Sequence, residues 1–143
     1  MPKGTNVCNN FLALLYNGTT WANVAINATA SPITDIYMAL ANVTGAPGDT
    51  MSTSETAYTN YVRQTIVRST LGFTAPSGAA TSNAAAVNYP QCGVTGDTIV
   101  AAKLGKAAGA SDVFHYGDLN SPVAVSNNIR LTFDIGDITI TEA

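Results

Sequence analysis

The hydrophobic pattern of the chain changes from a helical period to a period of two. In residues 6–17, apolar side chains recur at positions i, i+4, i+7 and i+8, which lie on one face of a helix. These apolar residues are Val7, Phe11, Leu14 and Leu15. Asn6 is the predicted N-cap and Gly18 the residue that ends the helix. The pattern predicts about three turns of amphipathic helix, whose apolar stripe must be covered by the same chain or by a neighbouring molecule.

Beyond residue 33 the apolar positions alternate, as is typical of β-strands. The predicted strands are 33–41, 58–70, 84–89, 98–104, 112–116, 122–125 and 129–141. The parity slips at Gly136-Asp137, so the last strand should bend or bulge there. The predicted turns and loops are 44–55, 73–82, 105–111 and 127–128, and residues 19–31 are expected to form an extended connection.

Short strands separated by turn signals about every ten residues are typical of an antiparallel β-sandwich or jelly roll. We therefore predict an all-β fold, an antiparallel jelly-roll-like β-sandwich with one short N-terminal helix. The 143 residues suit a single domain spanning 1–143. Within it, we expect the helix at 6–17 and the sandwich at 32–142.

The composition is nearly uncharged, which changes the classes of function to consider. Only six Lys and Arg and nine Asp and Glu occur, and the net charge is −3, whereas Thr, Asn and Ser together account for 41 residues. So few cations leave no basic surface for nucleic acid, and we predict no nucleic-acid partner. No apolar run is long enough to cross a membrane, and no signal-peptide pattern stands at the start, so no membrane partner is expected either.

Residues able to carry catalysis are scarce. His115 is the one imidazole, and Asp112 and Asp118 stand at an odd spacing from it, on the opposite face of a strand. Cys8 and Cys92 form no CxxC motif, and we expect reduced thiols. No nucleophile elbow, calcium loop or phosphate-binding glycine motif occurs. We expect no catalytic residue, no cofactor and no metal, and we interpret His115 as a half-exposed strand residue.

Arginines stand out in a chain with so few cations. Arg63 and Arg68 lie in one predicted strand with opposite parity, so they point to opposite faces unless a bulge intervenes. Arginine and tyrosine are enriched at interface hot spots, and Tyr58 and Tyr61 lie close by. These four residues are the candidate interface. The alternatives are ordinary rim charges for the arginines and core positions for the tyrosines.

Two short segments are distinctive, YTNYVR at 58–63 and SNAAAVNYP at 82–90. Through these segments and the order of the others, over about 6–142, the chain resembles a family of small tailed-phage virion proteins. Many of these proteins are labelled phage tail fibre protein, and relatives of known structure are capsid cement, or decoration, proteins with a jelly-roll fold. The resemblance implies a virion protein without catalytic residues, made in the bacterial host cytoplasm.

Two functions of different kinds follow from these observations. The first is a cement protein that binds the major capsid protein on the outer capsid surface and bridges neighbouring capsomers. Neutral polar surfaces suit such a role, because burying them costs little desolvation. The alternative is a tail-associated receptor-binding or fibre-tip module that recognises host surface glycans with Tyr, Ser, Thr and Asn side chains. Either protein is expected to form a homo-oligomer, a dimer or a trimer.

Overall fold

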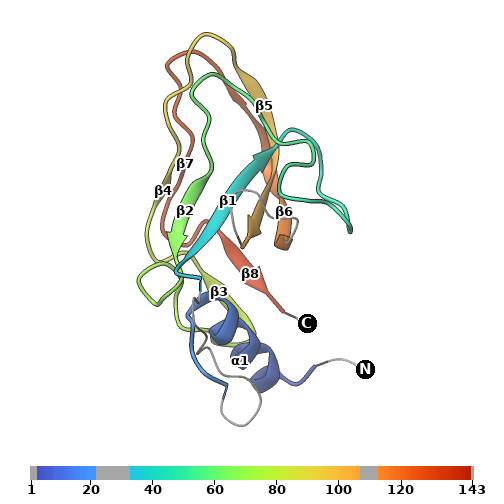
Figure 1. Ribbon diagram of the computed structural model, residues 1–143, viewed down its shortest axis with the longest axis vertical. Coiled ribbons are helices and arrows are strands. Elements are labelled where there is room, and N and C mark those ends of the chain that lie inside the picture. The colour runs from blue at the N-terminus through green and yellow to red at the C-terminus, as the bar shows by residue number, and fades with distance from the viewer. Residues whose placement is uncertain (1–2, 22–32, 107–112, 143) are drawn as a thin grey trace. The chain divides into compact units, whose positions relative to one another are not determined.

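The computed structural model describes residues 3–21, 33–106 and 113–142 (Figure 1). One helix and eight strands are present in these ranges: α1 (Thr5–Tyr16), β1 (Asp35–Ala41), β2 (Gln64–Val67), β3 (Ala80–Ser82), β4 (Val87–Asn88), β5 (Asp97–Gly105), β6 (Val113–Val125), β7 (Thr132–Phe133) and β8 (Thr139–Thr141). The all-β class with antiparallel pairing and one short N-terminal helix is confirmed. The jelly-roll arrangement stays a prediction.

The chain forms two compact units, each built from separate stretches of sequence. The first, here called the helical unit, comprises Met1–Asp35, Ile66–Ala86 and Phe133–Ala143. The second, the sheet unit, comprises Ile36–Thr65 and Val87–Thr132. Both units therefore depend on contacts between residues that are distant in the sequence. The expectation of one domain over 1–143 stays a prediction.

The helix of the helical unit ends as its sequence predicts but begins differently. Gly18 has a positive φ of 67°, a conformation that glycine adopts without a steric cost. The Thr19 N–H then donates to the Ala13 carbonyl at 3.0 Å. The prediction of Asn6 as N-cap is wrong, because Gly4 holds that position without a side-chain hydrogen bond. The N-cap therefore lies two residues earlier than predicted, and Asn6 belongs to the first turn.

The buried face of α1 is not the predicted apolar stripe. The buried residues are Cys8, Leu12 and Tyr16. Val7 and Phe11, in contrast, are 42% and 38% exposed, so the chain itself does not cover them, and cover by a neighbouring molecule stays a prediction. Leu14 and Leu15 are half-buried. The face that packs inward carries polar as well as apolar side chains, because particular residues of the helical unit contact it.

Three contacts select this helix face. The Tyr16 ring packs on the Phe73 ring with 4.8 Å between their centroids. The Asn17 side chain donates to the Phe73 carbonyl at 2.9 Å, and the Asn9 side-chain oxygen accepts from the Ala79 N–H at 2.6 Å. Both hydrogen bonds are partly shielded from water, so losing either would leave a backbone group poorly satisfied. These contacts therefore determine which face of the helix packs against the rest of the unit, although the apolar spacing favours a different face.

Asn83 holds the bend that the parity slip predicts. Gly136 has a φ of 88°, and β7 and β8 stand on either side of it, so the bend is confirmed. The fully buried Asn83 side chain accepts from the N–H groups of Gly136 and Ile138 and donates to the carbonyls of Ala85 and Asp134. One amide thus bonds three backbone groups of the turn and the nearby Ala85 carbonyl. Because the chain bends here, β8 pairs with β3 and β7 with β4.

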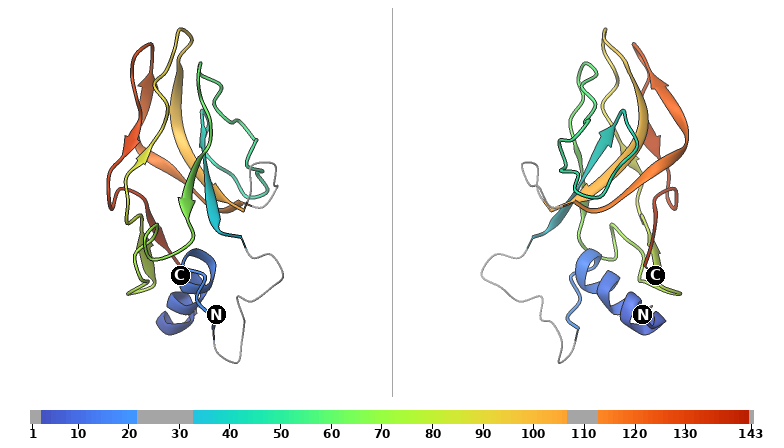
Figure 2. Two further views of the ribbon diagram at one scale, coloured as in Figure 1. Left: turned by 60° about the vertical axis from the view of Figure 1, so that its left-hand side comes forward. Right: turned by 90° about the vertical axis from the view of Figure 1, so that its right-hand side faces the viewer.

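The sheet unit is built around a four-stranded sheet of order β2-β1-β5-β6. β1 pairs antiparallel with β5, with Met38 opposite Leu104 and Leu40 opposite Ala102. Ile36, Met38 and Leu40 are fully buried, as the alternation predicts. In both views of Figure 2, β5 and β6 run alongside each other. The predicted strands 33–41 and 98–104 are therefore confirmed.

Several other predicted strands are wrong in extent. Of 58–70, only β2 is a strand, because Asn60 has a φ of 75° and the Tyr61 N–H donates to the Tyr58 carbonyl in a turn. Asparagine tolerates this conformation better than most residues. The predicted strand 84–89 shrinks to β4, and β3 lies inside the predicted turn 73–82. The predicted strands 112–116 and 122–125 belong to one strand, β6. The predicted connection 19–31 and loop 105–111 lie largely outside the described residues.

We expect the burial of α1 to be measurable as stability. Leu12→Ala should lower the free energy of unfolding by about 2–5 kcal/mol, because it removes a fully buried side chain. The control is Val7→Ala on the exposed face of the same helix, which should cost under about 0.5 kcal/mol. Denaturant unfolding monitored by circular dichroism measures both. Equal losses for the two variants would show that the helix is packed on a different face.

The edge strand β6 has features that favour self-association. β6 is thirteen residues long, and Asp118 is its one Asp, Glu, Lys or Arg residue. Between the pairs Ile99–Val123 and Ala101–Asp118 the register shifts, so β6 bulges there. Long edge strands with few charges pair readily with other strands. We propose that β6 contributes to a homo-oligomer.

A charge placed on β6 should weaken that association. A Cβ at Gly117 would meet nothing within 4 Å, so Gly117→Lys should leave the protomer folded. The control is Val94→Lys, which adds the same charge at a loop position that is 88% exposed. Sedimentation velocity at micromolar concentration should show an oligomer for the wild type and the control and a smaller species for Gly117→Lys. A monomeric wild type would refute the proposal.

Candidate functional site

The candidate site lies where the chain returns to the end of β1 in the sheet unit. Glu55 forms an isolated antiparallel bridge with Ala41. The Thr56 N–H donates to the Leu40 carbonyl at 3.0 Å, and the Asn42 N–H donates to the Ser54 carbonyl at 3.0 Å. The segment around Glu55 is thus fixed to β1 through its backbone. This places the Glu55 carboxylate beside the turn that carries Tyr58, Tyr61 and Arg63.

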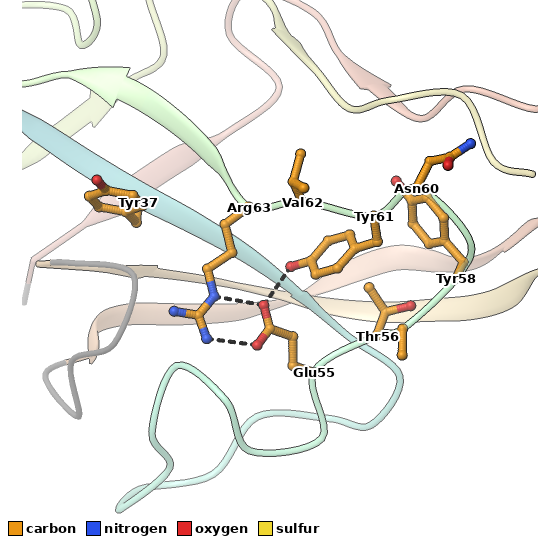
Figure 3. Close-up of a pocket in the computed structure, with 9 residues that line it drawn as sticks. Tyr37, Glu55, Thr56, Tyr58, Asn60, Tyr61, Val62 and Arg63 are labelled. Atoms are coloured by element: carbon orange, nitrogen blue, oxygen red, sulfur yellow. Dashed lines mark hydrogen bonds and ion pairs between the residues drawn. The ribbon is translucent and has the colours of Figure 1, made fainter.

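Arg63 and Glu55 form a two-point ion pair (Figure 3). Arg63 Nε donates to Glu55 Oε1 at 2.7 Å and Nη2 to Glu55 Oε2 at 2.6 Å. Nη2 also donates to the Ser52 hydroxyl at 2.8 Å. The two charged side chains are only 12% and 19% exposed, and the hydrogen bonds to Glu55 raise the pKa of Arg63 further. Pairs with this geometry are among the strongest charged contacts in proteins.

Tyr61 connects the ion pair to the core of the sheet unit. Its hydroxyl donates to Glu55 Oε1 at 2.8 Å and accepts from the Leu40 N–H at 3.0 Å. Its ring is stacked on Tyr89 at 6.0 Å and meets Tyr58 edge-on at 5.3 Å. Burial raises the pKa of Tyr61 above its ordinary value of 10.0. The hydroxyl therefore remains a donor at physiological pH.

These side chains border an open depression with a volume of about 620 Å³. Its lining residues all come from β1 and the segment 55–63; they are Tyr37, Glu55, Thr56, Ala57, Tyr58, Asn60, Tyr61, Val62 and Arg63. The volume is within the range of small-molecule sites. Within the described residues, Arg63 Nη1 is shielded from solvent and has no hydrogen-bond acceptor. The depression is thus lined by tyrosines beside the Glu55–Arg63 ion pair.

Three of the four candidate interface residues are brought together here, and the fourth is not. Tyr58, Tyr61 and Arg63 line the depression, although Tyr58 itself is only 2% exposed. Arg68 belongs to the helical unit, where Nε donates to the Leu15 carbonyl at 2.6 Å and Nη2 to the Leu14 carbonyl. Arg68 therefore caps the C-terminal end of α1 with a positive charge. Whether any of the four contacts another protein stays a prediction.

Two charged residues of the sheet unit, Glu55 and Lys103, are not among the site residues that the sequence predicts. Lys103 is 1% exposed, and its Nζ contacts Asp49 Oδ2 at 2.9 Å and donates to the carbonyls of Thr50 at 3.2 Å and Thr53 at 2.7 Å. A buried cation needs such partners. The alternation of β5 places Lys103 on its buried face, beside Ile99 and Ala101. That parity is the signal that could have identified it.

The cysteines and His115 are not among the residues that line the depression. Cys8 and Cys92 are buried free thiols, as expected, and His115 is a half-exposed residue of β6, as interpreted from the sequence. In the described parts of the chain, no group of three or more His, Cys, Asp or Glu could hold a metal ion. The same residues include no helix long and apolar enough to cross a membrane.

A known protein family matches most of the chain. Residues 13–141 match the model of the family described as Podophage GP4 fiber I protein gp80. The chain belongs to this family. No curated protein matches it. Membership makes this gp80-family chain a phage structural protein of the fibre type, which agrees with the virion role implied by the sequence resemblance. The finer assignment to capsid cement proteins is not made by this match.

The ion pair of Lys103 predicts how the stability of the sheet unit depends on pH. Hydrogen bonds from Lys103 and from the Ala46 N–H lower the pKa of Asp49 below its ordinary value of 3.8. A carboxylate with a lowered pKa stabilises the fold above the unfolded value, and this contribution is lost as the pH falls through the folded pKa. The free energy of unfolding should therefore decrease below pH 3.8.

Asp49→Asn tests this pH dependence. The variant should be less stable than the wild type at pH 7, and its stability should fall less steeply between about pH 5 and pH 2. Asp118→Asn, which removes an exposed carboxylate from β6, is the control and should keep the wild-type slope. Denaturant unfolding at a series of pH values measures the three curves. Parallel curves for Asp49→Asn and the wild type would contradict the prediction.

Proposed function

We propose that this protein is a subunit of a phage tail fibre and takes part in recognition of the host surface. The observation that carries the proposal is the family match over residues 13–141, because the family is named for a fibre protein. The match includes residues of both compact units and begins within α1. The fibre role was the alternative in the sequence analysis, and the family name now favours it.

The chemistry of the sheet unit supports recognition by binding. The depression combines tyrosine side chains with amide and hydroxyl groups, which are the groups that contact sugars in binding sites. His115 is not among the residues that line it. We therefore propose that the protein acts without catalysis and without a cofactor. A homo-oligomer, dimer or trimer, would present several depressions to one cell surface and gain avidity.

A capsid cement role is the second candidate, and the low charge of the chain favours it. With 15 charged residues among 143, most of the surface can be buried against the major capsid protein at a small desolvation cost. The edge strand β6 could supply main-chain hydrogen bonds to a capsid subunit. In this role the protein would lie on the outer capsid surface and bridge neighbouring capsomers.

The position of the protein on the virion distinguishes the two candidates. Immunogold labelling and quantitative mass spectrometry of purified particles should place a small number of copies at the tail if the fibre proposal holds. The purified protein should also slow phage adsorption when it is mixed with host cells beforehand. Hundreds of copies over the head, without any effect on adsorption, would overturn the fibre proposal and support the cement role.

A further inference from the structure

We propose that three loops of the sheet unit form a surface that docks on an apolar, uncharged patch of a host surface protein. The loops are residues 58–62, 91–95 and 126–130, here together called the loop tip. They lie side by side at one end of the sheet unit (Figure 1 and Figure 2). This inference rests on the proposed function and deepens it, because it names the kind of partner and the surface that contacts it.

Backbone hydrogen bonds join the first loop of the tip to the second. The Thr59 N–H donates to the Thr95 carbonyl at 2.8 Å, and the Gly93 N–H donates to the Thr59 carbonyl at 3.0 Å. The Thr59 hydroxyl also accepts from the Thr95 N–H at 3.0 Å. The packing is close, because a Cβ at Gly93 would lie 2.7 Å from Thr59 Cγ2. The two loops therefore hold each other in one conformation.

The third loop is joined to the second in the same way. The Cys92 N–H donates to the Ile129 carbonyl at 2.8 Å, and the Asn128 N–H donates to the Cys92 carbonyl at 2.9 Å. The Gln91 side chain donates to the Asn128 carbonyl at 2.8 Å. Asn60 and Asn128 have positive φ angles of 75° and 66°, which persist only where surrounding contacts hold them. The loop tip is thus fixed before it meets a partner and loses little conformational entropy on docking.

Each loop of the tip presents one branched aliphatic side chain to solvent. Val62 is 55% exposed, Val94 is 88% exposed and Ile129 is 46% exposed. The exposed side chains of Asn60 and Gln91 add neutral polar groups to the same loops. Single exposed apolar side chains are ordinary, but apolar groups gathered among polar ones mark interaction surfaces. Because β-branched side chains are stiff, their burial against a partner costs little side-chain entropy.

The charge of the loop tip favours a neutral partner surface. Arg130 is the one charged residue in the three loops. A single positive charge gives little long-range attraction. A highly charged partner surface would lose its hydration on docking without gaining counter-charges. The matching partner surface is therefore apolar, with neutral hydrogen-bonding groups around it.

The side chains that the loop tip exposes favour a protein over a saccharide. Its two aromatic residues are not displayed: Tyr58 is 2% exposed, and Tyr61 is half-buried with its hydroxyl bonded to the Leu40 N–H. The exposed apolar groups are aliphatic instead. Such groups gain free energy when they enter an apolar part of another protein surface, whereas a saccharide covered with hydroxyls offers no comparable apolar area.

Binding of the fluorescently labelled full chain to host cells, measured by flow cytometry, tests the kind of partner. Protease treatment of the cells should remove most of the binding, whereas periodate, which oxidises saccharides, should leave it unchanged. Binding should persist in 1 M salt, because screening does not weaken apolar contacts. Binding that survives protease, or that periodate abolishes, would overturn the proposal. So would equal binding to protein-free vesicles of host lipids.

Variants of the loop tip test the surface itself. Val94→Asp should weaken cell binding about tenfold or more, because docking would bury an unpaired carboxylate. Ile129→Asp should act in the same direction and replaces Val94→Asp if that variant does not fold by circular dichroism. The matched control is Leu71→Asp, which adds the same charge at a 76% exposed position of the helical unit and should bind as the wild type does. Unchanged binding of the folded tip variants would overturn the proposal, as would an equal loss in the control.

The adsorption assay separates this inference from the proposed function. If the wild type and both tip variants slow phage adsorption equally, the fibre role stands and docking through the loop tip is wrong. If the wild type binds cells through Val94 in a protease-sensitive way but has no effect on adsorption, the docking surface stands and the fibre role is wrong. Loss of both cell binding and the adsorption effect in the tip variants supports both.

Discussion

The ion pair between Glu55 and Arg63 is the contact on which the geometry of the depression depends. Glu55 is fixed to the end of β1, and Arg63 immediately precedes β2, so the pair closes the segment between them. Tyr61 joins the pair to the Leu40 backbone and to the ring of Tyr89. A partly buried ion pair contributes to stability only when its hydrogen bonds are nearly complete. In this pair, Nη1 of the Arg63 guanidinium has no acceptor among the described residues.

The same rule explains the other polar groups in the interior of this protein. Lys103 is buried on β5 and is compensated by Asp49 and two backbone carbonyls. In the helical unit, the Asn83 amide bonds three backbone groups at a bend and the Ala85 carbonyl, and Arg68 caps the Leu14 and Leu15 carbonyls near the end of α1. Each group ties loops and short strands to one another. Because most of the strands are short, these side-chain contacts stabilise the fold where long strand pairing would do so in other β proteins.

The chain has few charged residues, which limits how it can recognise a partner. Family membership makes the protein a phage structural protein of the fibre type. Few charges mean little long-range steering and a weak dependence on salt. Recognition then has to come from local groups. The tyrosine-lined depression of the sheet unit offers such groups, among them the side chains of Tyr37, Asn60 and Tyr61.

The sequence by itself determined the features that depend on neighbours along the chain. The change of period predicted one helix followed by strands, Gly18 marked the end of the helix, and the parity slip located the bend at Gly136. Only the tertiary structure decided which face of α1 is buried, that residues 58–63 turn instead of extending, and that Arg63 meets Glu55. These outcomes depend on partners far away in the sequence, such as Phe73 for Tyr16. Periodicity reports which side chains share a face, whereas the free energy of burying that face depends on what the rest of the chain brings against it.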